Sequence, residues 1–318
     1  MSADGETRGA GGTGGAVRPV RRLRAGDEVR LVSPCSPPYP ERLREGVRML
    51  REWGLVPTFG DHRIPDGIST RPAAERAAEF QDALTDPTVR AVLVTRAGSG
   101  GDELVPLLDF STLERQPKPV CGFSDVTHFH GAIAATAQRP SFHTPELAWN
   151  RRLNGPRSAS ALRELLMGHG RPVRVGPDAV ARSHGPAAAG RIRGGNLSTL
   201  VHVEPPAHRS GDVLFLEELR EPPAGVAALL ARITERGHAD DVAAVVLGQF
   251  IDCGEQSQLR TVLESWCDSV TGTVLAGVPV GHGTEQESLA LGWPVEVDPV
   301  GGVLAYTTSP ASAVTGWD

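Results

Sequence analysis

The sequence is poor in cysteine, has no long hydrophobic run and carries no excess of positive charge. Its four cysteines are Cys35, Cys121, Cys253 and Cys267, without a C-x-x-C pair. Such scattered cysteines argue against a disulfide framework and indicate reduced thiols. No apolar stretch approaches the length that crosses a bilayer. A net charge of −6 leaves no basic patch for nucleic acid or an anionic membrane surface.

The chain also lacks the signature of an export signal at its start. Residues 1–17 are dominated by glycine, alanine and threonine and contain no apolar core. We therefore predict a disordered tail over residues 1–19 and a cytoplasmic location, with neither nucleic acid nor membrane as a partner.

The 318 residues are enough for two domains, and the first half alternates strand and helix patterns. Strands are predicted at Glu28–Ser33, Leu55–Phe59, Val89–Thr95 and around Val120, and helices at Glu41–Trp53, Ala73–Leu84 and Asp102–Leu108. This alternation indicates a parallel sheet covered on both faces, with ligands bound beyond the carboxyl ends of its strands. We expect Arg96–Gly101 and Ser124, which both follow strands, to share that rim.

The second half has more strand. The predicted strands are Ala189–Arg193, Val213–Leu216, Val242–Leu247, Val274–Val280 and Gly302–Tyr306, with a helix at Gly225–Arg236. Residues 151–188 are rich in arginine, proline, glycine and alanine around one helical stretch, Ser158–Met167. We therefore predict an α/β protein with an N-terminal domain at 20–150, a connection at 151–188 and a C-terminal domain at 189–318.

A serine stands at the corner between a predicted strand and helix, in Gly122-Phe123-Ser124-Asp125. A tight turn there exposes the hydroxyl, and the N–H groups of the helix start point to the same spot, where they can stabilise an oxyanion. The alternative is that Ser124 only caps the helix, since serine is a preferred N-cap residue.

A serine nucleophile needs a base and a carboxylate, and the second half offers both. Glu217 and Glu218 end an apolar strand, which is expected to place them at a rim rather than in the core. His282 follows another apolar run, between two glycines. Because side chains alternate along a strand, only one of the two glutamates can face His282. Instead of forming a catalytic pair, the glutamates could simply be a solvated strand end, and His282 could belong to an ordinary Gly-His-Gly turn.

Five segments resemble, in order and approximate spacing, the LD-carboxypeptidases, a serine peptidase family that also contains the microcin C self-immunity hydrolases. They are Arg96–Gly100, Gly122–Asp125, Gly194–Ser198, Leu216–Glu218 and Gly281–Gly283. The resemblance extends from about Leu23 to about Asp298, nearly the whole chain beyond the predicted tail.

The resemblance implies that Ser124 is the nucleophile, Glu217 the triad carboxylate and His282 the general base. It implies an oxyanion hole made by the backbone N–H groups of Asp125 and Gly98. It also implies a Rossmann-like N-terminal domain carrying the serine, a smaller β-rich C-terminal domain carrying the other two residues, a homodimer, and no metal or cofactor. The implied reaction releases a terminal residue from a small peptide, such as D-alanine from a cytoplasmic muropeptide tetrapeptide.

The glycine-rich loop departs from the family pattern. The family reads Gly-Gly-Tyr-Gly where this chain has Ala97–Gly100 with Ser99 in place of the tyrosine, and Glu103 stands farther along. This departure leaves a second substrate class possible. The chain could be an immunity-like or biosynthetic hydrolase that acts on a peptidyl- or aminoacyl-nucleotide or on another small amide. A non-catalytic binder on the same scaffold is a third alternative. We expect Ser99, Gly100, Trp149 and Asn196 to contact the substrate.

The sequence also contains residues typical of two other kinds of site. His128, His130 and His143, with Asp125, suggest a metal site, but His128 and His130 are two positions apart on a predicted helix and face different directions. The glycines near Gly98 lack both a complete G-x-G-x-x-G and the lysine of a phosphate-binding loop. We therefore expect neither a metal nor a nucleotide cofactor.

Overall fold

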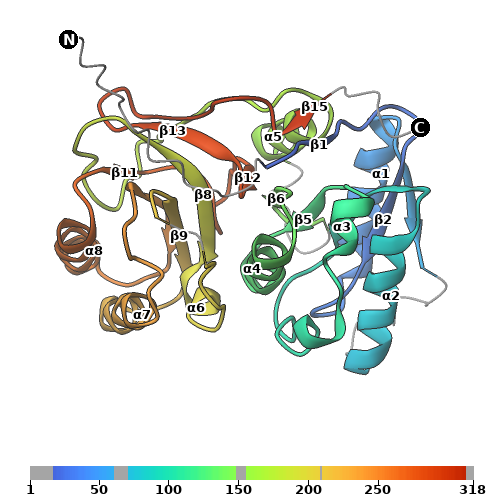
Figure 1. Ribbon diagram of the computed structural model, residues 1–318, viewed down its shortest axis with the longest axis horizontal. Helices are drawn as coiled ribbons and strands as arrows, with labels where there is room; N and C mark the ends of the chain where they lie inside the picture. The colour runs from blue at the N-terminus through green and yellow to red at the C-terminus, as the bar shows by residue number, and fades with distance from the viewer. Residues whose placement is uncertain (1–16, 61–70, 148–154, 208–209, 313–318) are drawn as a thin grey trace, which may run out of the picture.

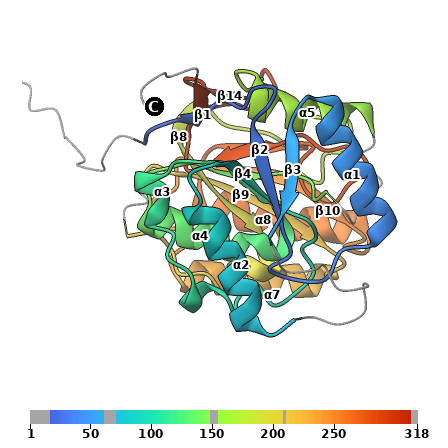
Figure 2. The same ribbon diagram turned by 90° about the vertical axis from the view of Figure 1, so that its right-hand side faces the viewer.

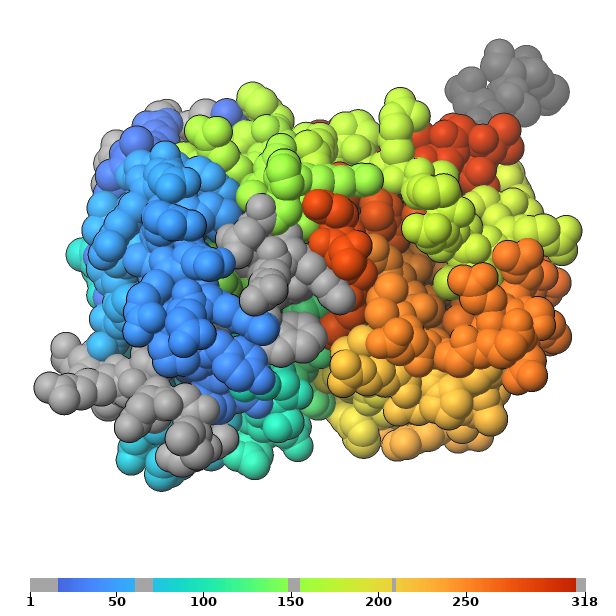
Figure 3. All heavy atoms as spheres, turned by 180° about the vertical axis from the view of Figure 1, so that it is seen from behind, coloured from blue at the N-terminus to red at the C-terminus, as the bar shows by residue number. Residues whose placement is uncertain are grey.

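The computed structural model describes residues 17–60, 71–147, 155–207 and 210–312. The described chain forms two lobes that lie side by side, one blue to green and the other mostly yellow to red (Figure 1). The same division is visible from behind, where blue and orange surfaces lie on opposite sides of the molecule (Figure 3). Each lobe is built around one main sheet.

The sheet of the first lobe has six strands. In chain order they are β2 (Glu28–Val32), β3 (Val56–Phe59), β4 (Val89–Val94), β5 (Val120–Gly122), β6 (Ser141–His143) and β12 (Leu289–Leu291). Their spatial order is β12-β6-β5-β4-β2-β3, and every pair is parallel except β6 with β12. Figure 2 shows β2, β3 and β4 side by side. The predicted parallel sheet is confirmed, with one additional strand from the far end of the sequence.

Helices cover both faces of this sheet. They are α1 (Pro40–Glu52), α2 (Ala73–Thr85), α3 (Thr112–Arg115), α4 (Thr127–Thr136) and α5 (Pro156–Met167). Because successive strand residues point to opposite faces, Leu93 of β4 packs in one core with Leu50 of α1, whereas Val92 packs with Phe80 of α2 and Phe129 of α4. The parallel sheet is thereby buried on both sides, as parallel sheets generally are.

The second lobe contains a seven-stranded sheet with helices against it. Its elements are β7 (Val173–Arg174), β8 (Ala188–Asn196), α6 (Leu197–Leu200), β9 (Val213–Leu219), α7 (Pro223–Glu235), β10 (Ala244–Ile251), α8 (Gln256–Val270), β11 (Val274–Ala276), β13 (Pro294–Asp298) and β14 (Val303–Tyr306). The order is β11-β10-β9-β8-β13-β14-β7. Strands β8 to β11 pair in parallel, and β13, β14 and β7 add antiparallel pairs. A short pair, β1 (Val20–Arg21) with β15 (Ala311–Ser312), joins the two ends of the described chain.

Two helical segments differ from the prediction. The segment Asp102–Leu108 forms only a 3₁₀ turn over Val105–Leu107, because Pro106 lacks the N–H that an α-helix through this segment would use. Helix α8 is not among the predicted helices, although Leu259, Leu263 and Cys267 recur one turn apart and form its buried side.

The described chain is already packed ahead of residue 20, the predicted boundary between tail and fold. Val17 lies against the core of the first lobe, and the N–H of Arg18 donates to the carbonyl of Gln138 over 3.1 Å. Residues 1–16 of the predicted tail lie outside the described residues. Within the described ranges, no helix is both long enough and apolar enough to cross a membrane.

Candidate active site

Ser124 lies at the corner between β5 and α4, half-buried, with the unusual backbone angle φ = +58°. Phe123 before it is extended, and residues Ser124–Val126 form a 3₁₀ turn that leads into α4. A non-glycine residue in this left-handed region is strained by about 1 to 3 kcal/mol, and such strain clusters at functional sites. The capping alternative is wrong: Phe123 and Val126 are the N-cap residues here, and neither helix start has a side-chain cap bond.

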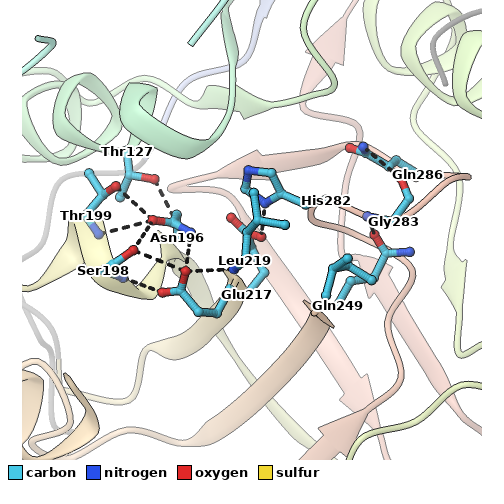
Figure 4. A network of polar contacts seen from close by, with 12 residues as sticks. Thr127, Asn196, Ser198, Thr199, Glu217, Leu219, Gln249, His282, Gly283 and Gln286 are labelled. Atoms are coloured by element: carbon cyan, nitrogen blue, oxygen red, sulfur yellow. Dashed lines mark hydrogen bonds and ion pairs between the residues drawn. The ribbon is translucent and has the colours of Figure 1, made fainter. Parts of the chain in front are cut away.

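The two predicted partners from the second lobe are in direct contact. Nδ1 of His282 donates to Oε2 of Glu217 over 2.7 Å, and the side chains are only 2% and 0% exposed (Figure 4). Gly281 has φ = +138°, and a Cβ there would stand 2.9 Å from the same carboxylate oxygen, so only glycine lets the chain approach Glu217 this closely.

The expected position of the glutamates at a rim is wrong. Strand β9 continues to Leu219, and Glu217 and Glu218 both lie inside it, paired to β8 or β10 and buried. The structure can hold these carboxylates in its interior because polar hydrogens face them there.

Glu218 points to a different set of partners from Glu217. It accepts hydrogen bonds from the backbone N–H groups of Ser198 and Leu219, both over 2.7 Å, and from the amide of Asn196 over 3.3 Å. Burial, aided by the charge of Glu217, raises the pKa of Glu218. Of the two adjacent glutamates, Glu217 is therefore the one that meets His282.

Phe123 connects the serine corner to this pair. Its ring centroid lies 4.5 Å from that of His282, with a tilt of 35° between the planes. The residue that directly precedes Ser124 thus packs against the imidazole contributed by the other lobe. Folding brings the serine corner, the histidine and the carboxylate into one region.

The glycine-rich loop after β4 shares the rim with Ser124. The N–H of Gly101 donates to Oδ2 of Asp125 over 2.8 Å. At the other end of the loop, the N–H of Ala97 donates to the buried carboxylate of Glu146. The N–H of Ser99 donates to the hydroxyl of Ser36 over 3.2 Å. Side chains from three other segments thus hold this loop in place.

Gly98 lies in the middle of this loop with φ = +101°, and a Cβ there would collide with Ser36. In the part of the chain that the structure describes, no residue accepts a hydrogen bond from the N–H of Gly98 or of Asp125. A backbone N–H without a protein partner is available to a ligand.

Two predicted substrate contacts, Ser99 and Gly100, lie on the same loop. Ser99 is exposed and Gly100 is partly exposed, and the carbonyl of Gly100 accepts a hydrogen bond from buried Arg76 over 3.0 Å.

Burial alters the titration of several groups around the site. It raises the pKa of Glu146 to about 8 despite the N–H of Ala97, because ionisation would leave a charge in the interior. Burial also raises the pKa of the Cys35 thiol well above its ordinary value. The pKa of His143 is held well below its ordinary range by burial and by the neighbouring His130 and His282.

The remaining predicted contacts fall in different places. Asn196 is the N-cap of α6, accepting from the N–H of Thr199 over 3.1 Å, and its own N–H donates to Thr127 beside the serine corner (Figure 4). Trp149 lies outside the described residues. No cluster of three metal-binding side chains occurs among the residues that the structure describes.

The sequence did not predict three side chains that support the site. Glu146 and Arg76 hold the loop of Gly98, and His143 lies beside Glu217. The sequence suggests His143 only as a metal ligand. None of the three residues follows an apolar run, so no local pattern marks them.

Two family models match the chain. The model of the LD-carboxypeptidase N-terminal domain matches residues 29–144, and that of the LD-carboxypeptidase C-terminal domain matches residues 189–297. The chain is 32% identical to a putative carboxypeptidase of Streptomyces coelicolor over 91% of this chain and 95% of that protein. It is 28% identical to a probable murein peptide carboxypeptidase of Bacillus subtilis over 92% and 93%.

A solved structure supports the fold. The structure of MccF in complex with glutamyl sulfamoyl guanosine has a TM-score of 0.79 to this chain at 22% identity, covering 92% of this chain and 99% of that one. The match spans both lobes, so the whole architecture is shared. With its sequence matching this family in both halves, the chain belongs to the LD-carboxypeptidase family.

Proposed function

We propose that this chain is a serine-dependent amide hydrolase that removes a terminal residue from a small peptide. Ser124 is the nucleophile, His282 the general base and Glu217 the carboxylate that orients it. The observation that carries this proposal is the buried 2.7 Å bond between Glu217 and His282, with Phe123, the neighbour of Ser124, packed on the imidazole. The nucleophile then comes from one lobe and its activating pair from the other.

The reaction proceeds in two steps. The hydroxyl oxygen of Ser124 attacks the scissile carbonyl carbon as its proton passes to Nε2 of His282. His282 then gives that proton to the leaving amine, the C–N bond breaks, and an acyl-serine remains. A water molecule attacks the ester, its proton passing through His282 back to Ser124, and the acid product leaves.

Glu217 acts through its contact with Nδ1. A carboxylate only accepts hydrogen bonds, so this contact keeps a proton on Nδ1 and leaves Nε2 as the base. The buried negative charge also stabilises the imidazolium that forms during attack.

The N–H groups of Asp125 and Gly98 are proposed to bind the oxyanion. Both belong to segments joined by the bond from Gly101 to Asp125, which fixes the loop relative to the serine corner. Prearranged donors of this kind are worth about 10²–10³-fold in rate each.

The proposed substrate is a small peptide with a free carboxyl terminus, such as a muropeptide tetrapeptide. The Bacillus subtilis relative is named a probable murein peptide carboxypeptidase, which supports this class. The second candidate is an aminoacyl-nucleotide analogue. It is favoured by Ser99, which stands in place of the family's tyrosine and is exposed on the loop, and by the fold shared with MccF. A cytoplasmic homodimer is part of the proposal.

The nucleophile is tested with a fluorophosphonate probe on the purified protein, with the adduct located by mass spectrometry. We expect an adduct on Ser124 in the wild type and none in Ser124→Ala. Ser269→Ala is the matched control, because Ser269 is exposed at the end of α8 and should leave labelling unchanged. Labelling elsewhere, or none, contradicts the proposal.

The substrate class is tested by incubating the enzyme with a muropeptide tetrapeptide and with an aminoacyl sulfamoyl adenosine. We expect release of the terminal D-alanine from the first. Turnover of only the second would favour the alternative candidate. Binding of either compound without turnover, and unchanged in Ser124→Ala, would instead identify a non-catalytic binder.

A further inference from the structure

His143 is a buried histidine that the proposed mechanism leaves without a role. It ends β6, where it pairs with Gly122 of β5 on one side and Leu289 of β12 on the other. Only 1% of its surface is exposed. Its ring meets the edges of two aromatic rings, with centroids 6.0 Å from Phe123 and 5.3 Å from Phe215. His143 is thus held rigidly next to the strand that leads to Ser124.

Two polar atoms face each other here without other partners. Nε2 of His143 lies 4.0 Å from Oε1 of Glu217. Among the described residues, neither atom has a hydrogen-bond partner, although both are buried. Leaving a buried polar atom unpaired costs about 1 to 3 kcal/mol. A shift of about 1 Å would join the two atoms in a normal hydrogen bond, which would satisfy both.

The surroundings decide which form of the imidazole fits. The groups that face His143 are the imidazole of His130 from α4, that of His282, the carboxylate of Glu217 and the backbone carbonyl of His143 itself. Burial and the two neighbouring histidines lower the pKa of His143 well below its ordinary range, so the ring is neutral. A neutral ring has one N–H and one lone pair. A lone pair on Nε2 would repel the carboxylate, whereas an N–H there would bind it. The single proton of the neutral ring can serve either the backbone carbonyl of His143 or Glu217, and a hydrogen bond to a charged carboxylate is roughly twice as strong as one to a neutral carbonyl.

We propose that neutral His143 is a positioning residue, which carries its proton on Nε2 and donates it to Oε1 of Glu217. The inference rests on the proposed function of the Glu217–His282 pair. With Oε2 bound to His282 and Oε1 to His143, the carboxylate is anchored at both oxygens and cannot rotate about its terminal bond. His143 thereby keeps Glu217 aligned with the base without touching substrate.

Two substitutions separate this role from packing. His143→Phe retains a ring of similar shape but no donor, whereas His143→Gln retains an N–H at a similar reach. We expect His143→Phe to lower kcat and the rate of fluorophosphonate labelling about 10- to 100-fold, by analogy with the loss of partners that orient the ligands of a metal, with KM unchanged. His143→Gln should stay within a few-fold of the wild type. The acid limb of the kcat/KM profile should shift to lower pH in His143→Phe only, because the misaligned carboxylate stabilises the imidazolium less.

Equal activity of both variants and the wild type would overturn the inference, as would equal losses with an unchanged pH profile. If His143→Phe does not fold, the inference is tested on the wild type by its tautomer. Long-range ¹H–¹⁵N NMR spectra show which imidazole nitrogen of His143 carries the proton. We expect Nε2 of His143 to be protonated and the ring neutral throughout the working pH range. A proton on Nδ1 instead would overturn the inference. Failure of the proposed function is distinct, since the wild type itself would then show no label on Ser124.

Discussion

Ser124 combines conformational strain with a half-buried position. Its left-handed backbone, at φ = +58°, is held by the short turn between β5 and α4. Strain of this kind persists only where the surrounding fold imposes it. The side chain caps neither helix start, so no capping bond offsets the steric cost of this conformation.

Replacing Ser124 by glycine is expected to stabilise the protein relative to Ser124→Ala. Glycine adopts a left-handed conformation without the steric cost of about 1 to 2 kcal/mol that alanine retains. We expect a free energy of unfolding about 1 kcal/mol higher in Ser124→Gly, measured by urea denaturation, with neither variant active. At Ser269, within α8, the same pair of variants should show the reverse order, because glycine disfavours a helix. A lower stability of Ser124→Gly than of Ser124→Ala would contradict the role of strain.

The adjacent glutamates are expected to respond differently to the same change. Glu217→Gln presents an amide to His282, which disturbs the tautomer of the base, and should lower kcat about 10³–10⁴-fold, as loss of the triad acid does in other serine hydrolases. Glu218→Gln leaves the bond between Glu217 and His282 in place and should retain most of the activity. Steady-state kinetics on both variants checks this, and a greater loss in Glu218→Gln would reverse the assignment.

The loop of residues 96–101 is positioned by elements that surround it. Asp125 from the serine corner and Glu146 from the segment after β6 each accept one of its N–H groups. Arg76 of α2 holds the carbonyl of Gly100. Since the loop itself is neither helix nor strand, its shape depends on these side chains, and one of them titrates near neutrality.

The free energy of unfolding is expected to fall as the pH rises from about 4.5 to about 8. Burial raises the pKa of Glu146 to about 8, so the folded protein keeps a proton that the unfolded chain releases at lower pH. The stabilisation is complete below the unfolded pKa, is lost as the pH rises through the folded pKa, and changes no further above it. In Glu146→Gln this decline should be smaller by a few kcal/mol, measured by denaturation across pH. Exposed Glu75 provides the control: Glu75→Gln should show the wild-type decline.

The two lobes are joined by more than the chain between them. Strand β12, from the C-terminal half, pairs with β6 and completes the first sheet. Thr127 at the start of α4 accepts from the N–H of Asn196 at the end of β8. At Gly195, a Cβ would stand 2.5 Å from the hydroxyl oxygen of Thr127. This close approach places the start of α4 next to β8 and β9 of the other lobe, where Asn196 pairs with Glu217.

The full chain is therefore expected to unfold in one cooperative transition. Separating the lobes would remove β12 from its sheet and expose Ala290 and Trp293, which belong to the core of the first lobe. Calorimetry should give equal calorimetric and van't Hoff enthalpies, and a fragment of residues 1–150 should fail to fold by itself. Two separate transitions, or a stable fragment, would contradict this coupling.

Much of the local structure follows from the sequence by itself. The period of apolar residues predicts α1 over Glu41–Trp53, and the apolar run at Val89–Thr95 predicts β4. Polar residues that follow apolar runs identify Ser124, Glu217 and His282 as candidates, although Glu217 lies inside β9 and Ser124 follows a strand of the other sheet. Such signals are local, which is why one sequence suffices to read them.

The sequence alone determined which residues could perform the chemistry, and only the tertiary structure decided how they meet. The alternation of side chains showed that one of Glu217 and Glu218 faces His282, but the pairing of β9 with its neighbours selected Glu217. The sequence also did not predict the entry of β12 into the first sheet or the position of His143 beside Glu217. These contacts join residues far apart in the chain, and their geometry is set by strand register and packing rather than by any local pattern.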